Sequence, residues 1–296
     1  MGVFSNVVAR PTVRFLTQKR KPRAIPLSDF ERMRYELRPC DVLLVEGRSR
    51  VADVIRMVTL SPWTHAALYI GRLHDVEDPE LRAFIQHRAN PSPEDQLLIE
   101  SELGLGTVIT PLSKYQQDHV RLCRPKGLAI QDAHRVVAFA VQRLGIPYDV
   151  RQIFDLFRLL FPWLILPRRW RSSLFQHNAG TPTRTVCSTM IAEAFGEVQF
   201  PILPLVKQST ESGTVQLYRR NPKLFTPSDF DYSPYFDIIK YPFVDFASHS
   251  SYRLLPWSGV SALGNAVEEK MGLTAEEAQM YIDTTRETGT GSQSAD

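Results

Sequence analysis

Short apolar runs alternate with polar turns along most of the chain, and this pattern predicts a sheet of short strands with helices packed on it. The apolar runs end at Gly, Pro or polar residues, which is typical of strands. The predicted strands are 41–47 (DVLLVEG), 65–71 (HAALYIG), 96–101 (QLLIES), 106–112 (GTVITPL) and 119–125 (HVRLCRP). Apolar residues three and four positions apart predict helices over 50–59, 131–144 and 187–196.

Two further segments are predicted from local signals. Ser28 followed by Glu31 predicts a helix that runs to about Leu37, because a Ser-x-x-Glu box satisfies two free backbone N–H groups. Residues 74–95 are polar and contain Asn-Pro-Ser-Pro, so they are predicted as a surface insertion.

Composition divides the chain into three parts. Residues 1–37 are a basic N-terminal arm with a short helix, residues 38–262 are the main domain, and residues 263–296 are an acidic, partly disordered tail. The main domain contains an apolar insertion at about 150–180. A chain of 296 residues can bury a core without disulfides. Its three cysteines form no CxxC pair, which argues against a structural zinc site.

The apolar insertion raises the question of a membrane. Residues 153–167 fall short of the roughly 20 residues that a span needs, and Pro162 would kink a helix there. No signal peptide is recognised either, so we expect a cytoplasmic protein. Residues 153–171 end in arginines, and two interpretations stay open: a peripheral membrane contact, or packing on the protein's own core or on a partner. Nucleic-acid binding is not expected, because the arginines of the arm are not interleaved with aromatic residues.

Cys187 is the candidate nucleophile. It stands at the start of a predicted helix, where free N–H groups and the helix dipole favour a thiolate, and Arg184 adds positive charge nearby. The alternative is that Cys187 is a small buried apolar residue. Cys40 and Cys123, which lie beside or within strand runs, fit that alternative.

His65 is the candidate base, and a carboxylate on a neighbouring strand is the candidate group that orients it. His65 begins an apolar strand, where burying an imidazole needs a reason. Glu100 ends the apolar run LLIE, an unusual place for a charge unless it is paired. Glu102 has the same side-chain parity along the strand, so both carboxylates remain candidates from the pattern alone.

The ordered set of segments resembles the permuted papain-like amidases of the YiiX/YaeF type, in the NlpC-type superfamily of cysteine hydrolases. The resemblance rests on DVLLVEG, THAALYIG, LLIESELGLGTVITPLSKY, GIPYD, CSTMIAEAFG and the late segment TPSDFDYSPYFDII, and it covers roughly residues 38–240. In papain the cysteine precedes the histidine, whereas here the histidine strand comes first, as in the permuted group.

The resemblance implies a fold and a set of site residues. The fold is α+β and circularly permuted papain-like, with a small, mainly antiparallel sheet and the nucleophile at a helix N-terminus. By position, Cys187 matches the nucleophile, His65 the base, Glu100 the residue that orients it, and Tyr148 a tyrosine that lines the cleft. One departure is that Cys40 stands in the middle of a turn that is usually Pro-Gly-Asp, although Cys tolerates positive φ less readily than Gly.

The implied function is hydrolysis of an amide or ester bond through a Cys-His-Glu triad and an acyl-enzyme, with no metal and no organic cofactor. The substrate would be peptide-like or lipid-like. Two other functions stay open at this point: a lipid acyltransferase or phospholipase-like enzyme at a membrane surface, and a non-catalytic binding module of the same fold.

Overall fold

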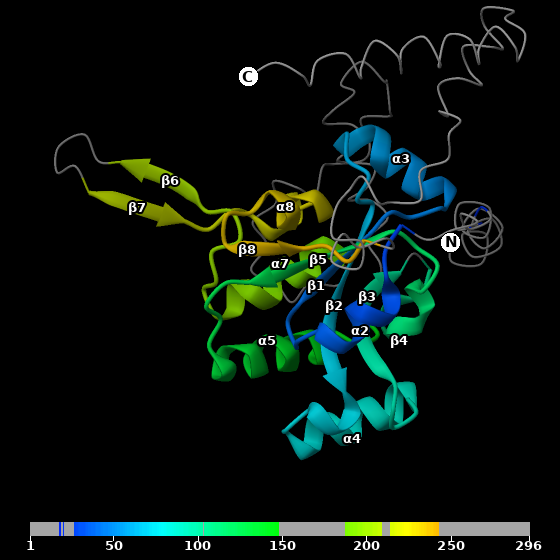
Figure 1. Cartoon of the computed structure of the whole chain (residues 1–296). Helices are drawn as coiled ribbons and strands as arrows, with labels where there is room; N and C mark the ends of the chain where they lie inside the picture. Colours follow the sequence, from blue (N-terminus) through cyan, green and yellow to red (C-terminus); the bar gives the residue numbers. More distant parts are fainter. Residues whose placement is uncertain are drawn as a thin grey trace, which may run out of the picture. The chain divides into compact units, whose positions relative to one another are not determined.

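Six strands form one antiparallel sheet in the order β4-β3-β2-β1-β5-β8 (Figure 1). This computed structural model describes residues 18, 20, 27–102, 104–147, 187–208 and 214–242. The strands are β1 (Val42–Val45), β2 (His65–Arg72), β3 (Gln96–Glu102), β4 (Gly106–Pro111), β5 (Val120–Pro125) and β8 (Phe236–Ile239). The expected α+β fold with a mainly antiparallel sheet is confirmed, and the first five strands match the predicted ones.

Several sequence predictions fall on other parts of the chain. Most of the basic arm, the insertion at 150–180 with the surface 153–171, Tyr148, and the tail 263–296 lie outside the described residues. The predicted boundaries of the three parts therefore stay predictions.

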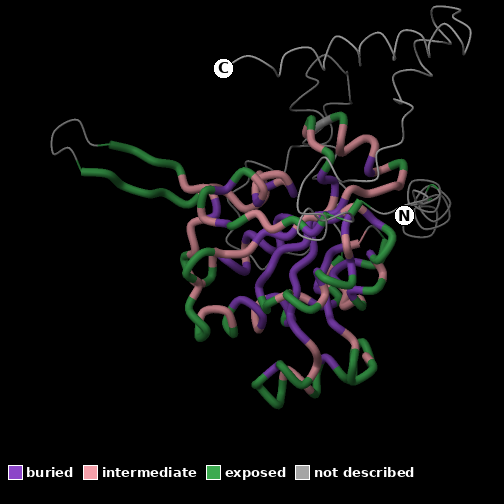
Figure 2. The backbone as a smooth tube through the Cα atoms, in the orientation of Figure 1, coloured by how far each residue is buried: buried purple, intermediate pink, exposed green. Residues whose placement is uncertain are grey.

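Helices cover both faces of the sheet because strand side chains alternate between two apolar clusters. The helices are α2 (Phe30–Glu36), α3 (Arg50–Thr59), α4 (Pro79–Ala89), α5 (Ile130–Gln142), α7 (Cys187–Glu197) and α8 (Pro227–Tyr232), with short 3-10 turns at η1 (Leu73–Asp75), η2 (Leu112–Tyr115) and η3 (Pro222–Leu224). In β2, Leu68 and Ile70 belong to the cluster that includes residues of α5 and α7, whereas Ala67 and Tyr69 belong to the cluster that includes residues of α2 and η2. The buried residues accordingly follow the sheet (Figure 2).

The structure corrects one local prediction and adds a helix to another. Helix α2 is capped by Asp29, whose carboxylate accepts from the N–H of Arg32 at 3.0 Å, and not by Ser28. The Ser28 hydroxyl donates instead to the Val120 carbonyl at 3.1 Å, because the chain at Ser28 lies beside the start of β5. The segment 74–95, predicted as a surface insertion, contains the helix α4.

Residues 205–208 and 215–218 form a feature that the pattern did not predict. Strands β6 (Leu205–Gln208) and β7 (Val215–Tyr218) pair only with each other among the described residues, and they project from the body of the protein (Figure 1). Every described residue of the two strands is exposed.

Candidate active site

His65 opens β2 next to a firmly held tryptophan. Trp63 is 2% exposed, its Nε1 donates to Asp231 at 3.2 Å, and the guanidinium of Arg121 lies 4.7 Å from the centre of its ring. Arg121 is also paired with Asp231 at 2.7 Å. His65 itself pairs with Val45 of β1 in the sheet register. The backbone that carries His65 is therefore fixed by its contacts with the core of the domain.

Glu100 lies on the neighbouring strand β3 and is fully buried. Its Oε2 accepts from His65 Nε2 and from the Tyr115 hydroxyl, the latter at 2.5 Å. Its Oε1 accepts from the Thr110 hydroxyl and from Lys114 Nζ, the latter at 2.7 Å. Four donors from three elements thus surround one carboxylate, as a buried charge requires.

The hydrogen-bond and ion-pair partners of Glu100 and His65 determine the protonation of these two side chains. Burial alone would raise the pKa of the Glu100 carboxyl, but the hydrogen bond and charge of His65, with those of Lys114, hold the pKa well below its usual range. Burial alone would lower the pKa of His65, but the Cys187 thiolate and Glu100 raise it to about 10. The imidazole is therefore held as an imidazolium beside the Glu100 carboxylate.

Cys187 is the first residue of α7 and is the other partner of His65. Burial disfavours the thiolate, but the charge and hydrogen bond of His65, together with hydrogen bonds from the backbone N–H groups of Ala66 and Ser188, outweigh it and lower the pKa of Cys187. Because Nε2 of His65 is engaged by Glu100, the ring nitrogen left for the sulfur is Nδ1. The result is a contact chain from sulfur to imidazole to carboxylate.

The structure separates the two carboxylates that the pattern left open. Glu100 contacts His65, whereas Glu102 contacts the ammonium group of Lys114. Cys187, His65 and Glu100 are brought together, and Tyr148 lies outside the described residues.

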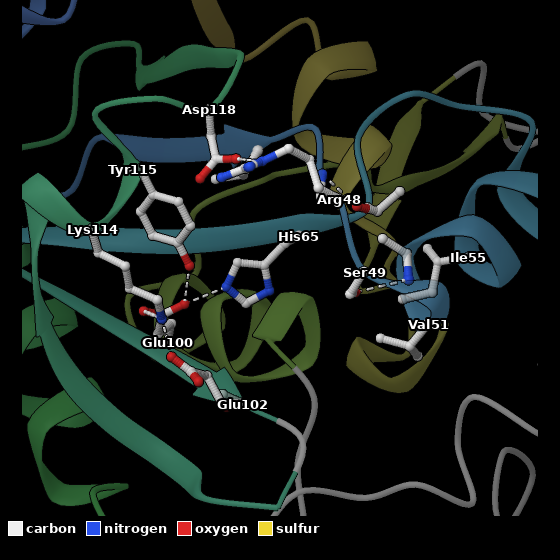
Figure 3. A pocket seen from close by; sticks show the side chains of 15 residues that line it. Arg48, Ser49, Val51, Ile55, His65, Glu100, Glu102, Lys114, Tyr115 and Asp118 are labelled. Atoms are coloured by element: carbon white, nitrogen blue, oxygen red, sulfur yellow. Dashed lines mark hydrogen bonds and ion pairs between the residues drawn. The ribbon is translucent and has the colours of Figure 1, made fainter. Parts of the chain in front are cut away.

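Beside His65 and Glu100 lies a cavity of about 180 Å³. Figure 3 shows Glu100, Lys114 and Tyr115 on one side of the His65 ring, and Ser49, Val51 and Ile55 of the α3 region on the other. Val45, Gly47, Arg48, Ala52, Thr64, Ser101, Glu102 and Asp118 complete the lining. One wall is therefore polar and charged, and the wall formed by α3 is largely apolar.

Gly47 allows this wall to come close. A Cβ atom at Gly47 would stand 2.6 Å from the Thr64 hydroxyl oxygen and 2.9 Å from the Ala52 Cβ. The Gly47 N–H donates to that same hydroxyl at 2.9 Å. The close approach places the start of α3 against the strand that His65 opens.

Three residues of the site were missed by the sequence analysis. Thr110, Lys114 and Tyr115 all touch Glu100, and they come from the end of β4 and from η2. The only signal in the sequence was the segment TPLSKY, in which a lysine and a tyrosine follow a strand. That pattern does not indicate that the two side chains contact Glu100.

The other two cysteines are structural, as expected. Cys40 and Cys123 are both fully buried, and burial raises the pKa of each, to about 12 for Cys40. Cys40 has φ of 73°, so the turn keeps its left-handed conformation although a cysteine replaces the glycine that is usual there. Its sulfur donates to the Ala133 carbonyl at 3.4 Å, which ties the turn to α5.

Two further properties concern only the described part of the chain. Within it, no group of three or more His, Cys, Asp or Glu side chains could hold a metal ion. Nor does any described helix have the length and apolar character needed to cross a membrane.

Comparisons with known proteins bear on the family that this chain resembles. A sequence comparison with curated proteins gives no match. Among solved structures, the metalloprotein yiiX from Escherichia coli O157:H7 is similar, with a TM-score of 0.42 and 14% identity, over 70% of this chain and 98% of that chain. Residues 36–155 match the family described as "Permuted papain-like amidase enzyme, YaeF/YiiX, C92 family", and these residues include His65, Glu100 and Lys114 but not Cys187. Over that range the chain is therefore similar to the permuted papain-like amidases of the YaeF/YiiX type, which supports a hydrolase.

Proposed function

We propose that this protein is a thiol hydrolase that cleaves an amide bond through an acyl-enzyme on Cys187. The observation that carries the proposal is the contact chain from Cys187 through His65 to Glu100. A non-catalytic binding module needs no ionised sulfur, and burial by itself opposes ionisation of a thiol. Strongly perturbed pKa values cluster at functional sites. The lowered pKa of Cys187 therefore favours the catalytic function.

In the first half of the reaction the Cys187 sulfur attacks the carbonyl carbon of the substrate. The backbone N–H of Cys187, at the start of α7, would help to hold the oxyanion, an interaction worth on the order of 3 kcal/mol per donor. As the bond to the leaving group breaks, His65 gives its Nδ1 proton to the leaving amine. Glu100 holds Nε2 throughout and so keeps the imidazole in one orientation.

In the second half a water molecule releases the acyl group. The water oxygen bonds to the acyl carbon while one of its protons passes to His65 Nδ1. The carbon–sulfur bond then breaks and leaves its electron pair on Cys187. The thiolate–imidazolium pair is restored, so the cycle needs no cofactor.

The size of the cavity restricts which group of a substrate can bind beside His65. The cavity of about 180 Å³ is close to the roughly 150 Å³ that holds a benzene ring in an engineered site. It therefore suits one compact group of a peptide-like or lipid-like acyl donor, with its apolar part against α3.

The test uses two small donors of the same acyl group, p-nitrophenyl acetate and p-nitroacetanilide. We expect wild type to gain the mass of one acetyl group on Cys187 with the ester, and to release nitroaniline from the amide. Cys187→Ala should show neither reaction while its circular dichroism spectrum is unchanged. Cys123→Ala, which removes a buried sulfur elsewhere, is the matched control.

Two results would contradict the proposal. Equal acetylation of wild type and Cys187→Ala would remove Cys187 as the nucleophile. Cleavage of the ester with no release of nitroaniline would replace the amidase by an esterase.

A further inference from the structure

Lys114 stands between two carboxylates at the edge of the site. Its Nζ lies 2.7 Å from Glu100 Oε1 and also contacts Glu102 Oε1. The Lys114 side chain is 22% exposed and that of Glu102 is 27% exposed, whereas Glu100 is fully buried. The inner carboxylate therefore relies on protein partners alone, and the outer one also reaches solvent.

The charges around Glu100 differ between the two halves of the proposed reaction, on which this inference rests. In the resting site the Cys187 thiolate faces the His65 imidazolium, and Glu100 faces both His65 and Lys114. In the acyl-enzyme the sulfur carries no charge, and His65 must be neutral to accept a proton from water. At that stage Lys114 is the one cation that contacts Glu100 among the described residues.

A buried carboxylate without a cation captures a proton. Without Lys114, a proton would remain on the His65–Glu100 pair in the acyl-enzyme, on either the imidazole or the carboxylate. In both cases His65 could not act as the base, because Nδ1 would carry a proton. An imidazolium is protonated on both ring nitrogens, and a carboxyl O–H that donates to Nε2 leaves the ring proton on Nδ1.

We propose that Lys114 is a positioning residue that keeps Glu100 negatively charged while His65 is neutral, so that His65 can act as the base for release of the acyl group. Lys114 does this through its charge and not through its hydrogen bond alone. Thr110 and Tyr115 also donate to Glu100, but both are neutral and cannot balance it.

The other charged groups near the site do not replace Lys114. Arg48, which lines the cavity, is paired with Asp118 at 2.5 Å. Glu102 faces the ammonium group from the outer side and lowers its net effect. Removing the cation should therefore leave Glu100, once His65 is neutral, with no compensating charge within contact distance in the described site.

The experiment measures release of acetate from pre-acetylated enzyme as a function of pH. Enzyme is acetylated with p-nitrophenyl acetate, freed of reagent, and moved to buffers between about pH 5 and 9, where loss of the acetyl mass from Cys187 is followed. For wild type the rate should rise with pH to a plateau, as His65 in the acyl-enzyme becomes neutral. In Lys114→Met the midpoint of that rise should move to higher pH by about one unit, which is about tenfold slower release below the midpoint.

Further variants separate charge from hydrogen bonding and from folding. Lys114→Gln keeps an N–H donor without the charge and should behave like Lys114→Met. Lys114→Arg should return the midpoint toward that of wild type. Lys126→Met removes the same charge from a surface pair with Asp237, so its midpoint should not move. Thermal unfolding of each variant shows whether it is folded.

The outcomes distinguish this inference from the proposed function. If wild type is never acetylated on Cys187, the proposed function fails. If wild type is acetylated and the midpoint is the same in Lys114→Met and Lys114→Gln, the role of Lys114 is wrong while the thiol hydrolase stands.

Discussion

The ionisation of Cys187 depends on one neighbour more than on any other. Burial opposes the thiolate, and His65 provides the largest opposing effects on the pKa of the sulfur. We therefore expect iodoacetamide to alkylate Cys187 at a rate that stays high well below pH 8.5, the usual thiol value. In His65→Gln the same rate should fall at neutral pH and recover only as the pH rises above about 8.5.

Mass spectrometry of the alkylated protein gives the site and the rate together. Cys40 and Cys123 serve as internal controls, because both are fully buried with raised pKa values and should stay unmodified in folded protein. An identical pH profile for wild type and His65→Gln would show that the imidazole does not hold the sulfur ionised.

At the scale of single residues, part of the candidate site could be predicted from the sequence. A histidine at the start of an apolar strand and a glutamate at the end of another are visible as misplaced polar residues, and they do meet. Lys114 and Tyr115 were not predictable, because a lysine and a tyrosine after a strand are ordinary surface residues until the fold buries a carboxylate beside them. Choosing between Glu100 and Glu102 likewise needed the contact with His65, since both have the same parity on β3.

Helix α3 ends on a residue that suits the position poorly. Leu60 follows the helix with φ of 51° and is 91% exposed. A left-handed conformation costs a residue with a Cβ atom about 1–2 kcal/mol, and a glycine at this position would avoid that cost. Part of the gain is offset because glycine increases the conformational entropy of the unfolded chain. We expect Leu60→Gly to raise the free energy of unfolding by about 0.5–1 kcal/mol, measured by urea denaturation.

Asn90 provides a matched control for this change. It follows α4 with φ of 44°, but asparagine tolerates that conformation, and its side chain accepts from Gln86 Nε2 at 2.7 Å. Asn90→Gly should therefore give no gain. A gain in Asn90→Gly as large as that in Leu60→Gly would mean that the conformational argument is wrong.

Elements with a strong apolar pattern were predictable, and elements held by side-chain contacts were not. Helix α3 has the predicted bounds, and five strands of the sheet were found from their apolar runs. Helix α4 was missed because only Ile85 on it is buried, so it carries little apolar periodicity. It is fixed instead by Asp78 at its N-terminus, whose carboxylate accepts from the N–H groups of Glu80 and Leu81.

For the whole molecule, the buried carboxylate at the site links folding to pH. The pKa of Glu100 is held below its usual value in the folded state, whereas in the unfolded chain it returns to about 4.3. The stabilisation is therefore fully present above about pH 4.3 and is lost as the pH falls toward the lower folded-state value. We expect the free energy of unfolding to drop less steeply between pH 5 and pH 3 in Glu100→Gln than in wild type.

Urea denaturation at several pH values checks this dependence. Glu31→Gln changes an exposed carboxylate on α2 that pairs with Arg34, and its slope should match that of wild type. Parallel slopes for wild type and Glu100→Gln would contradict the linkage, even if the variant is less stable at neutral pH.

At the same scale, the sheet was predictable but its assembly was not. The apolar runs indicated which segments are strands, yet the order β4-β3-β2-β1-β5-β8 brings β8 from near residue 236 to the edge beside β5. The residue pattern of 226–239 does not indicate that this segment pairs with β5. The resemblance to a known family, and not the periodicity, was what singled out that segment.

The order of the site residues along the chain has a consequence for biosynthesis. A ribosome completes β2, β3 and η2, with the imidazole, the carboxylate and the lysine, before it reaches α7. A nascent chain that stops before residue 187 thus has His65, Glu100 and Lys114 without the proposed nucleophile. The Cys187 sulfur is the last of these groups to be made, and it is added where its partners can already be in place.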